Sequence, residues 1–207
     1  MKILALETSG ATASIAVAED GTITAERRFA APRGRGAGIF TMLEKLRPFW
    51  AGLDRIALGL GPGSYNGLRV ACALAGSFRL ALGIPVVGAP SPCLLDVEDA
   101  DYLAVGDARG GQIHVARVSG HTLRAEIRLL PHAELAREVA ENGIAVYRTG
   151  PLAHADEVTE AAPSAAVLAR LAPSLAPLGP GPVLPIYLKP PHITQPRDSA
   201  PRLASQT

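Results

Sequence analysis

The chain of 207 residues is poor in several residue types, and each scarcity excludes a class of protein. Two cysteines are too few for a disulfide framework, and Cys72 stands in an apolar run where a thiol behaves as a small hydrophobe. The 20 basic residues are matched by 19 acidic ones, so no large basic field could hold nucleic acid tightly. No uncharged run approaches membrane-spanning length, and no signal-peptide core follows Lys2, so we expect a cytoplasmic protein.

Apolar residues make up 48% of the chain and charged residues 19%, a composition typical of a folded globular protein. Along the first ninety residues, apolar runs alternate with turn signals. They predict strands at 3–6, 12–18, 22–29, 55–60 and 85–89, with helices at 39–50, broken near Pro48, and at 67–82. The resulting order βββαβαβ predicts an α/β chain, one half of an actin-like, ribonuclease-H-like fold.

The rest of the chain predicts a reduced repeat of this half. Strands are expected at 102–105, 112–118, 122–130 and 144–148, with one helix at 132–141. Nine of the twenty-nine residues of 173–201 are proline, so we expect extended, partly mobile chain with one strand at 183–188. We therefore divide the chain into an N-terminal half (1–98), a reduced second half (99–190) and a mobile proline-rich tail (191–207).

A glycine-rich loop joins a predicted strand to a predicted helix at residues 61–69. Gly61 and Gly63 permit a tight turn, Asn66 is a good N-cap, and Gly67 allows close packing on the first helical turn. A structural turn without a ligand is the more common role of such a loop. Its motif residues are Gly61, Pro62, Gly63, Ser64, Asn66, Gly67 and Arg69.

The string Gly-Pro-Gly-Ser-Tyr-Asn-Gly-Leu-Arg at 61–69 is similar to the Gly-Pro-Gly-Ser-Phe-Thr-Gly-Leu-Arg signature of the TsaB, or YeaZ-like, family. This family belongs to the glycoprotease-like (peptidase M22) branch of the actin-like superfamily. Further landmarks resemble the family in the same order, at residues 3–9, 82–88, 107–111 and 187–189. The resemblance spans about residues 1–190 and is thin from 120 to 180. It implies an actin-like fold of two halves, the second reduced.

The resemblance also implies a function. The family supports a catalytic paralogue of the same fold, together with an ATPase subunit, in placing a threonylcarbamoyl group on the adenosine beside the anticodon of certain tRNAs. It implies a scaffold subunit without activity alone and without a cofactor, which meets tRNA only within the complex; a homodimer is left open. The five histidines contain no pair four residues apart, the spacing by which the catalytic paralogue holds its metal, so no metal site is predicted.

Two departures from the family pattern bear on nucleotide binding. Glu7 stands where relatives usually carry Asp, and its longer side chain would misplace the oxygens that orient a hydrated Mg²⁺. Residues 36–38 are Gly-Ala-Gly where most relatives begin the first helix with a His-Ser pair. We expect at most vestigial phosphate loops, made by Glu7, Thr8, Ser9, Asp107 and Arg109.

Two enzyme classes are alternatives to a scaffold. A small-molecule kinase or ATP-binding protein of the same superfold would need a phosphate loop in each half, and residues 107–111 could supply the second; Glu7 and the reduced second half disfavour it. A nicotinamide enzyme is disfavoured because Pro62 removes an amide that a pyrophosphate would use, and because residues 85–90 carry no acid.

The helix at 67–82 is apolar nearly all round, so both of its sides should be covered. We expect Val70 and Leu74 to face the sheet. A row of small residues on the other side would admit a helix, either the chain's own first helix or a partner's, and the resemblance favours a partner. The predicted interface consists of Ile39, Leu43, Leu46, Gly67, Ala71 and Ala75.

Overall fold

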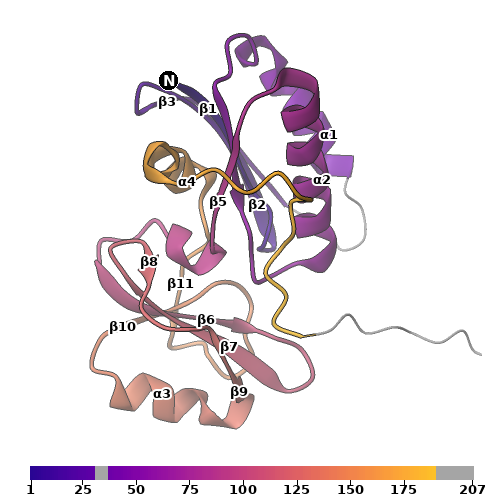
Figure 1. The fold of residues 1–207 in the computed structure, drawn as a ribbon. Helices are drawn as coiled ribbons and strands as arrows, with labels where there is room; N and C mark the ends of the chain where they lie inside the picture. The colour runs from indigo at the N-terminus through magenta and orange to yellow at the C-terminus, as the bar shows by residue number, and fades with distance from the viewer. Residues whose placement is uncertain (31–36, 190–207) are drawn as a thin grey trace, which may run out of the picture.

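A computed structural model describes residues 1–30 and 37–189 (Figure 1). The predicted tail at 191–207 and the first residue of the Gly-Ala-Gly segment, Gly36, lie outside this range. Within it, no helix has both the length and the apolar character needed to cross a membrane.

The first half is built on a five-stranded sheet with the order β3-β2-β1-β4-β5. Antiparallel pairing joins β1, β2 and β3, while β4 and β5 continue the sheet parallel to β1. The strands are β1 (Lys2–Glu7), β2 (Thr12–Glu19), β3 (Thr22–Ala30), β4 (Arg55–Gly59) and β5 (Val86–Ala89). The predicted order βββαβαβ is confirmed, and the chain has the actin-like α/β fold.

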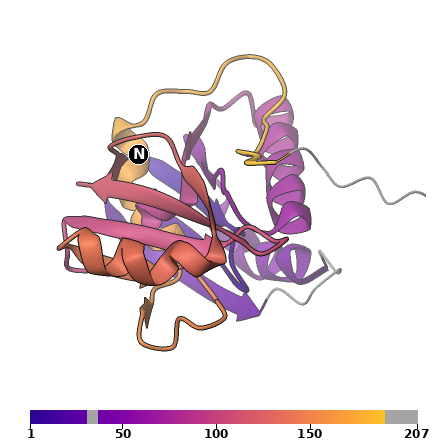
Figure 2. The same ribbon diagram turned by 90° about the horizontal axis from the view of Figure 1, so that it is seen from below.

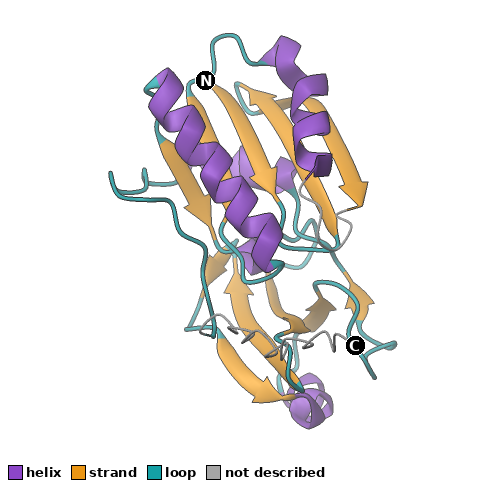
Figure 3. Cartoon of the chain, turned by 90° about the vertical axis from the view of Figure 1, so that its right-hand side faces the viewer, coloured by secondary structure: helices purple, strands orange, loops and turns teal. Residues whose placement is uncertain are grey.

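Helices cover both faces of this sheet, which is why β1 reads as an almost continuous apolar run. One face is covered by α1 (Ala37–Leu46), which continues into the 3₁₀ turn η1 (Arg47–Phe49), and by α2 (Tyr65–Leu82) (Figure 3). The opposite face is covered by α4 (Ala165–Leu171). Leu4 and Leu6 point to the first layer, whereas Ile3 and Ala5 point to the second.

The second half carries a six-stranded sheet on the far side of the 3₁₀ turn η2 (Ser91–Leu94), with the order β11-β10-β6-β7-β8 and β9 paired to β7. After the 3₁₀ turn η3 (His132–Glu134), α3 (Leu135–Glu141) covers its outer face (Figure 2). The predicted strand at 122–130 is divided into two short strands that both pair with β7. The strands are β6 (Asp101–Asp107), β7 (Gln112–Ser119), β8 (Thr122–Leu123), β9 (Arg128–Pro131), β10 (Ala145–Arg148) and β11 (Thr159–Glu160).

After β11 the chain returns to the first sheet, which the sequence did not predict. Helix α4, followed by the 3₁₀ turn η4 (Ala172–Ser174), packs on the alanine-rich face of that sheet, and Arg55 donates to the carbonyls of Ala172 and Leu175 at 2.6 and 3.1 Å. Residues 183–188 form no strand. Beyond α4 the described chain therefore runs along the first half as far as Ile186, whose N–H donates to the Leu60 carbonyl at 2.8 Å. The proposed domain boundaries stay a prediction.

The row of small residues on α2 faces the chain's own sheet. Ala71 and Ala75 are fully buried in the cluster that contains Ile56 and Leu58 of β4, and small side chains let the helix lie close to the strand. Val70 and Leu74, predicted to face the sheet, are half-buried at its flank.

The predicted partner interface does not fit this packing. On α1, the side chains of Ile39, Leu43 and Leu46 are buried in the same internal cluster as Ala71 and Ala75. Gly67 packs against the chain's own β1–β2 turn, because a Cβ placed there would lie 2.4 Å from the Thr8 carbonyl oxygen. A partner that meets these two helices must therefore use their outward side chains.

We predict that Ala75→Leu lowers the free energy of unfolding by about 1 to 3 kcal/mol, because added methylene groups overpack a filled core. Urea denaturation of the purified variant measures this loss. Ala73→Leu, on the exposed side of the same helix, is the matched control and should change stability little. Equal stability of the two variants would show that the Ala75 side of α2 is not packed as described.

Candidate functional site

A cavity of about 840 Å³ lies between the two halves. The structure brings three predicted elements together around it: the glycine-rich loop, the β1–β2 turn and the β6–β7 turn. The last described residues of the chain, 186–189, form a further part of its wall. The predicted loop residues that line it are Thr8, Ser9, Pro62, Gly63, Ser64, Asn66, Gly67, Asp107 and Arg109.

The glycines of the loop bring its backbone against the chain's own backbone. A Cβ at Gly63 would lie 2.3 Å from the Ser9 carbonyl oxygen, which itself accepts a hydrogen bond from the Ser64 N–H at 2.7 Å. Gly61 adopts φ +90°, a conformation that favours glycine. These contacts account for the motif glycines as a packing device between the start of α2 and the β1–β2 turn.

Ser64, and not the predicted Asn66, is the N-cap of α2. The Ser64 side chain accepts a hydrogen bond from the N–H of Gly67, while Asn66 lies inside the first turn. Both residue types favour the cap position, so composition alone did not distinguish them. Arg69, the last motif residue, does not line the cavity and donates to the Tyr65 hydroxyl at 2.6 Å.

Glu7 is buried and its carboxylate is occupied by the chain itself. The Ser9 N–H donates to Oε1 at 2.6 Å, and the Ser91 hydroxyl donates to Oε2 at 2.8 Å. Burial raises the pKa of Glu7, against the opposing effect of these hydrogen bonds. Gly59 makes room for the long side chain, because a Cβ there would lie 1.7 Å from Oε2. Glu7 therefore sits beneath the cavity and does not line it.

Sequence reasoning missed Gly59 and Ser91, which together with Ser9 hold Glu7. A glycine inside an apolar strand is a sign of close approach, and this signal at Gly59 was available. Ser91 gave no comparable signal, since its partner Glu7 is 84 positions away.

Two buried polar atoms on the cavity wall have no hydrogen-bond partner among the described residues. They are Thr8 Oγ1, in the β1–β2 turn, and His114 Nε2, on β7. Burial lowers the pKa of His114 to about 4, against the opposing charge of Asp107, so the ring is neutral near pH 7. A single histidine in an apolar strand was the sequence signal for this position, and we did not use it.

The second predicted phosphate loop is folded onto itself. The Arg109 N–H donates to Asp107 Oδ1 at 2.8 Å, and the Arg109 guanidinium lies 3.6 Å from Oδ2. Lys189 closes the loop from the C-terminal side by donating to the carbonyls of Ala108 and Arg109 at 3.0 and 2.9 Å. Asp107 thus acts as a cap of its own turn. In residues 1–30 and 37–189, no group of three or more histidine, cysteine or acidic side chains is placed to hold a metal.

Parts of the chain are similar to proteins that are named for a modification of tRNA. The family model described as TsaD, tRNA N6-adenosine threonylcarbamoyltransferase, matches residues 39–121. The tRNA threonylcarbamoyladenosine biosynthesis protein TsaB of Escherichia coli is 27% identical over 128 residues, 56% of this chain and 54% of that protein. An uncharacterized protein of Mycobacterium leprae, ML0378, is 44% identical over 66 residues, 31% of this chain and 18% of that protein. The chain thus matches about half the length of the curated TsaB protein and less of the mycobacterial one.

A solved structure agrees with the fold over almost the whole chain. The crystal structure of an uncharacterized Pseudomonas aeruginosa protein with similarity to peptidase YEAZ superposes with a TM-score of 0.74. The superposition covers 91% of this chain and 99% of that one, and at 20% identity it shows the shared fold alone.

We predict that His114 makes stability depend on pH. Its folded pKa of about 4 lies below the unfolded value of 6.5, so its contribution is present above pH 6.5 and is lost as the pH falls towards 4. The loss should amount to at most about 3 kcal/mol. Urea denaturation at several pH values should show this slope in the wild type and a flatter one in His114→Gln; comparing the two cancels the contribution of Glu7. Parallel pH profiles would contradict a buried neutral histidine.

Proposed function

Because the chain belongs to the TsaB family of the actin-like superfamily, we propose that it is a non-catalytic scaffold subunit of the machinery that forms threonylcarbamoyladenosine in tRNA. In this proposal it binds a catalytic paralogue of the same fold, and an ATPase subunit joins them. In this proposal only the complex binds tRNA. The protein then works in the cytoplasm, where the tRNA is. The chain catalyses no reaction alone.

The observation that carries this proposal is the outward face of α1 and α2, which exposes large apolar side chains. Leu80 is 89% exposed and Phe40 is 55% exposed. The exposure of Phe40 is notable because aromatic residues make up only 4% of the chain. Both helices lie on the same side of the first sheet (Figure 3). We infer that this layer of helices is the partner contact, because large exposed apolar side chains on a helical face can be buried by another protein.

The interior of the site supports the same proposal. The motif glycines are used to pack the loop on the β1–β2 turn, and the Glu7 carboxylate is used by Ser9 and Ser91. The Asp107 carboxylate accepts a hydrogen bond from the Arg109 N–H in its own turn. The two predicted carboxylates, Glu7 and Asp107, are thus engaged in holding the chain together.

We predict that Phe40→Glu combined with Leu80→Glu weakens binding of the catalytic paralogue from the same organism by tenfold or more, because charges would be buried unpaired at the contact. The melting temperature should stay unchanged, since both side chains are exposed. Isothermal titration calorimetry measures the affinity. Val139→Glu, which changes an exposed apolar residue on α3, is the matched control. If the double variant binds as tightly as the wild type, the helices are not the contact; self-association in place of binding would favour a homodimer.

A second candidate function is ATP binding, because Thr8 Oγ1 and His114 Nε2 stand unpartnered on the cavity wall. The scaffold proposal predicts that magnesium ATP leaves the melting temperature of the isolated chain unchanged. A ligand at 100 times its Kd would stabilise the fold by about 2.7 kcal/mol, a shift that differential scanning fluorimetry detects. A rise that disappears in Thr8→Val would favour the ATP-binding candidate.

A further inference from the structure

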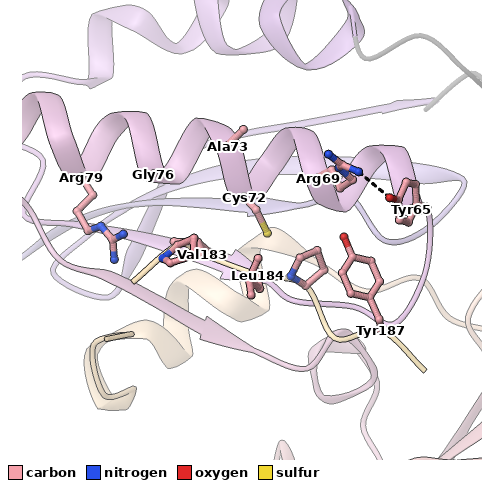
Figure 4. A pocket seen from close by; sticks show the side chains of 11 residues that line it. Tyr65, Arg69, Cys72, Ala73, Gly76, Arg79, Val183, Leu184 and Tyr187 are labelled. Atoms are coloured by element: carbon pink, nitrogen blue, oxygen red, sulfur yellow. Dashed lines mark hydrogen bonds between the residues drawn. The ribbon is translucent and has the colours of Figure 1, made fainter. Parts of the chain in front are cut away.

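A second hollow of the molecule, which no part of the proposed function uses, runs along one side of α2. One wall is the helix itself, and the other is the strap, which we define as residues 182–187. The hollow has a volume of about 550 Å³, and we call it the α2–strap groove (Figure 4).

The groove has fixed ends because α2 and the strap are tied at both of them. At one end, the Arg79 guanidinium donates to the carbonyls of Gly179 and Gly181 at 2.9 and 2.6 Å. At the other end, the rings of Tyr65 and Tyr187 lie against each other, with centroids 5.6 Å apart. A partner that enters the groove therefore meets a preformed shape and does not have to order it.

An arginine stands at each end of the groove, and neither has a carboxylate partner. Arg69 stacks on the ring of Tyr65, with its guanidinium carbon 5.2 Å from the centroid. Arg79 donates to the carbonyl oxygens of residues 179–181, which lead into the strap. Throughout the described part of the chain, no acidic side chain forms an ion pair with either arginine. Both guanidinium groups keep N–H groups that could donate hydrogen bonds to a carboxylate.

Between the two arginines the groove is apolar and shallow on the helix side. Cys72, Ala73 and Gly76 line this part of α2, with the Cys72 thiol pointing toward the strap, and Val183 and Leu184 line the groove on the strap side (Figure 4). A Cβ placed on Gly76 would meet nothing within 4 Å, so the space above it is open. The groove thus offers two cationic ends and an apolar centre.

The spacing of the two charges fits an extended peptide. Ten residues of helix separate Arg69 from Arg79, or about 15 Å along the axis. In an extended chain, residues four positions apart point to the same side and lie about 13 Å apart. This spacing is close to that of the two arginines, and their long side chains can bridge the remaining gap. Two acidic residues at this spacing would reach both guanidinium groups and leave an apolar side chain between them for the centre of the groove.

We propose that the α2–strap groove binds an extended acidic segment of a partner protein, with one carboxylate on Arg69, one on Arg79 and an apolar residue over Ala73 and Gly76. The chemistry disfavours RNA, because two cations around an apolar centre release few counterions. It also disfavours the chain's own residues 190–207, whose sequence carries two arginines and one aspartate. The proposal does not depend on the proposed function.

The test uses a fluorescein-labelled peptide, Gly-Ser-Glu-Leu-Ala-Val-Glu-Ser-Gly, and fluorescence anisotropy with the full chain. We expect saturable binding that weakens as salt is added, and affinity lower by about tenfold or more when both glutamates are replaced by glutamine. Arg69→Gln should weaken binding to a similar degree. Arg69 is chosen over Arg79 because it does not tie down the strap.

A second variant separates binding from folding. Gly76→Leu should fill the open centre of the groove and abolish binding, while it keeps or raises the melting temperature because glycine is a poor helix former. Ser77→Leu adds a leucine at the next, exposed position outside the groove and should bind the peptide like the wild type.

The proposal is overturned if the glutamate peptide does not bind, if it binds no better than the glutamine peptide, or if Gly76→Leu binds as the wild type does. Equal or stronger binding of a labelled single-stranded RNA of the same length, competing with the peptide, would also overturn it and assign the groove to nucleic acid.

Discussion

The structure depends on the close approach of two stretches of backbone, the β1–β2 turn at Thr8 and Ser9 and the loop at 61–67. Gly63 and Gly67 allow this approach, since a side chain on either would collide with a carbonyl oxygen. The contact fixes where α2 begins and therefore which of its sides meets the sheet. It also places the loop over Glu7 and forms one wall of the cavity between the halves. A loop that looks like a phosphate cradle thus has a sufficient structural reason for its glycines.

A second regularity is the difference in size between the two faces of the first sheet. The face under α1 and α2 carries Leu and Ile side chains, whereas the face under α4 is rich in alanine. Helix α4 is itself rich in alanine, so helix and sheet can approach closely on that face. This short helix is the main link by which the end of the chain is held to the first half, and the Ser14 hydroxyl supports it by accepting from the Ala165 N–H at 2.9 Å.

Much of the first half could be predicted from the sequence, because alternating apolar runs and turn residues determine short-range structure. The orientation of α2 could not, since a helix that is apolar on all sides gives no sign of which side meets the sheet. Helix α4 was missed just before the proline-rich stretch, although Ser164 followed by an alanine-rich run is an N-cap signal. Loops that line the cavity were identified from the sequence, but the cavity itself was not, since a reduced second half was expected to leave little of a cleft. The contact of Glu7 with Ser91 and the burial of His114 depend on residues distant in sequence. Whether the predicted site residues act on a ligand stays a prediction.

The return of the chain past α4 also determines how the sheet ends. Strand β5 lies at the margin of the first sheet, where unpaired backbone groups would invite a strand from another molecule. Pro177 bridges to Val87, and the Leu178 N–H donates to the Val86 carbonyl at 2.7 Å, so this margin is occupied by the chain itself. At the opposite margin, β3 presents Glu26, Arg27 and Arg28. Both margins of the first sheet thus oppose its growth into fibres or strand-exchanged dimers.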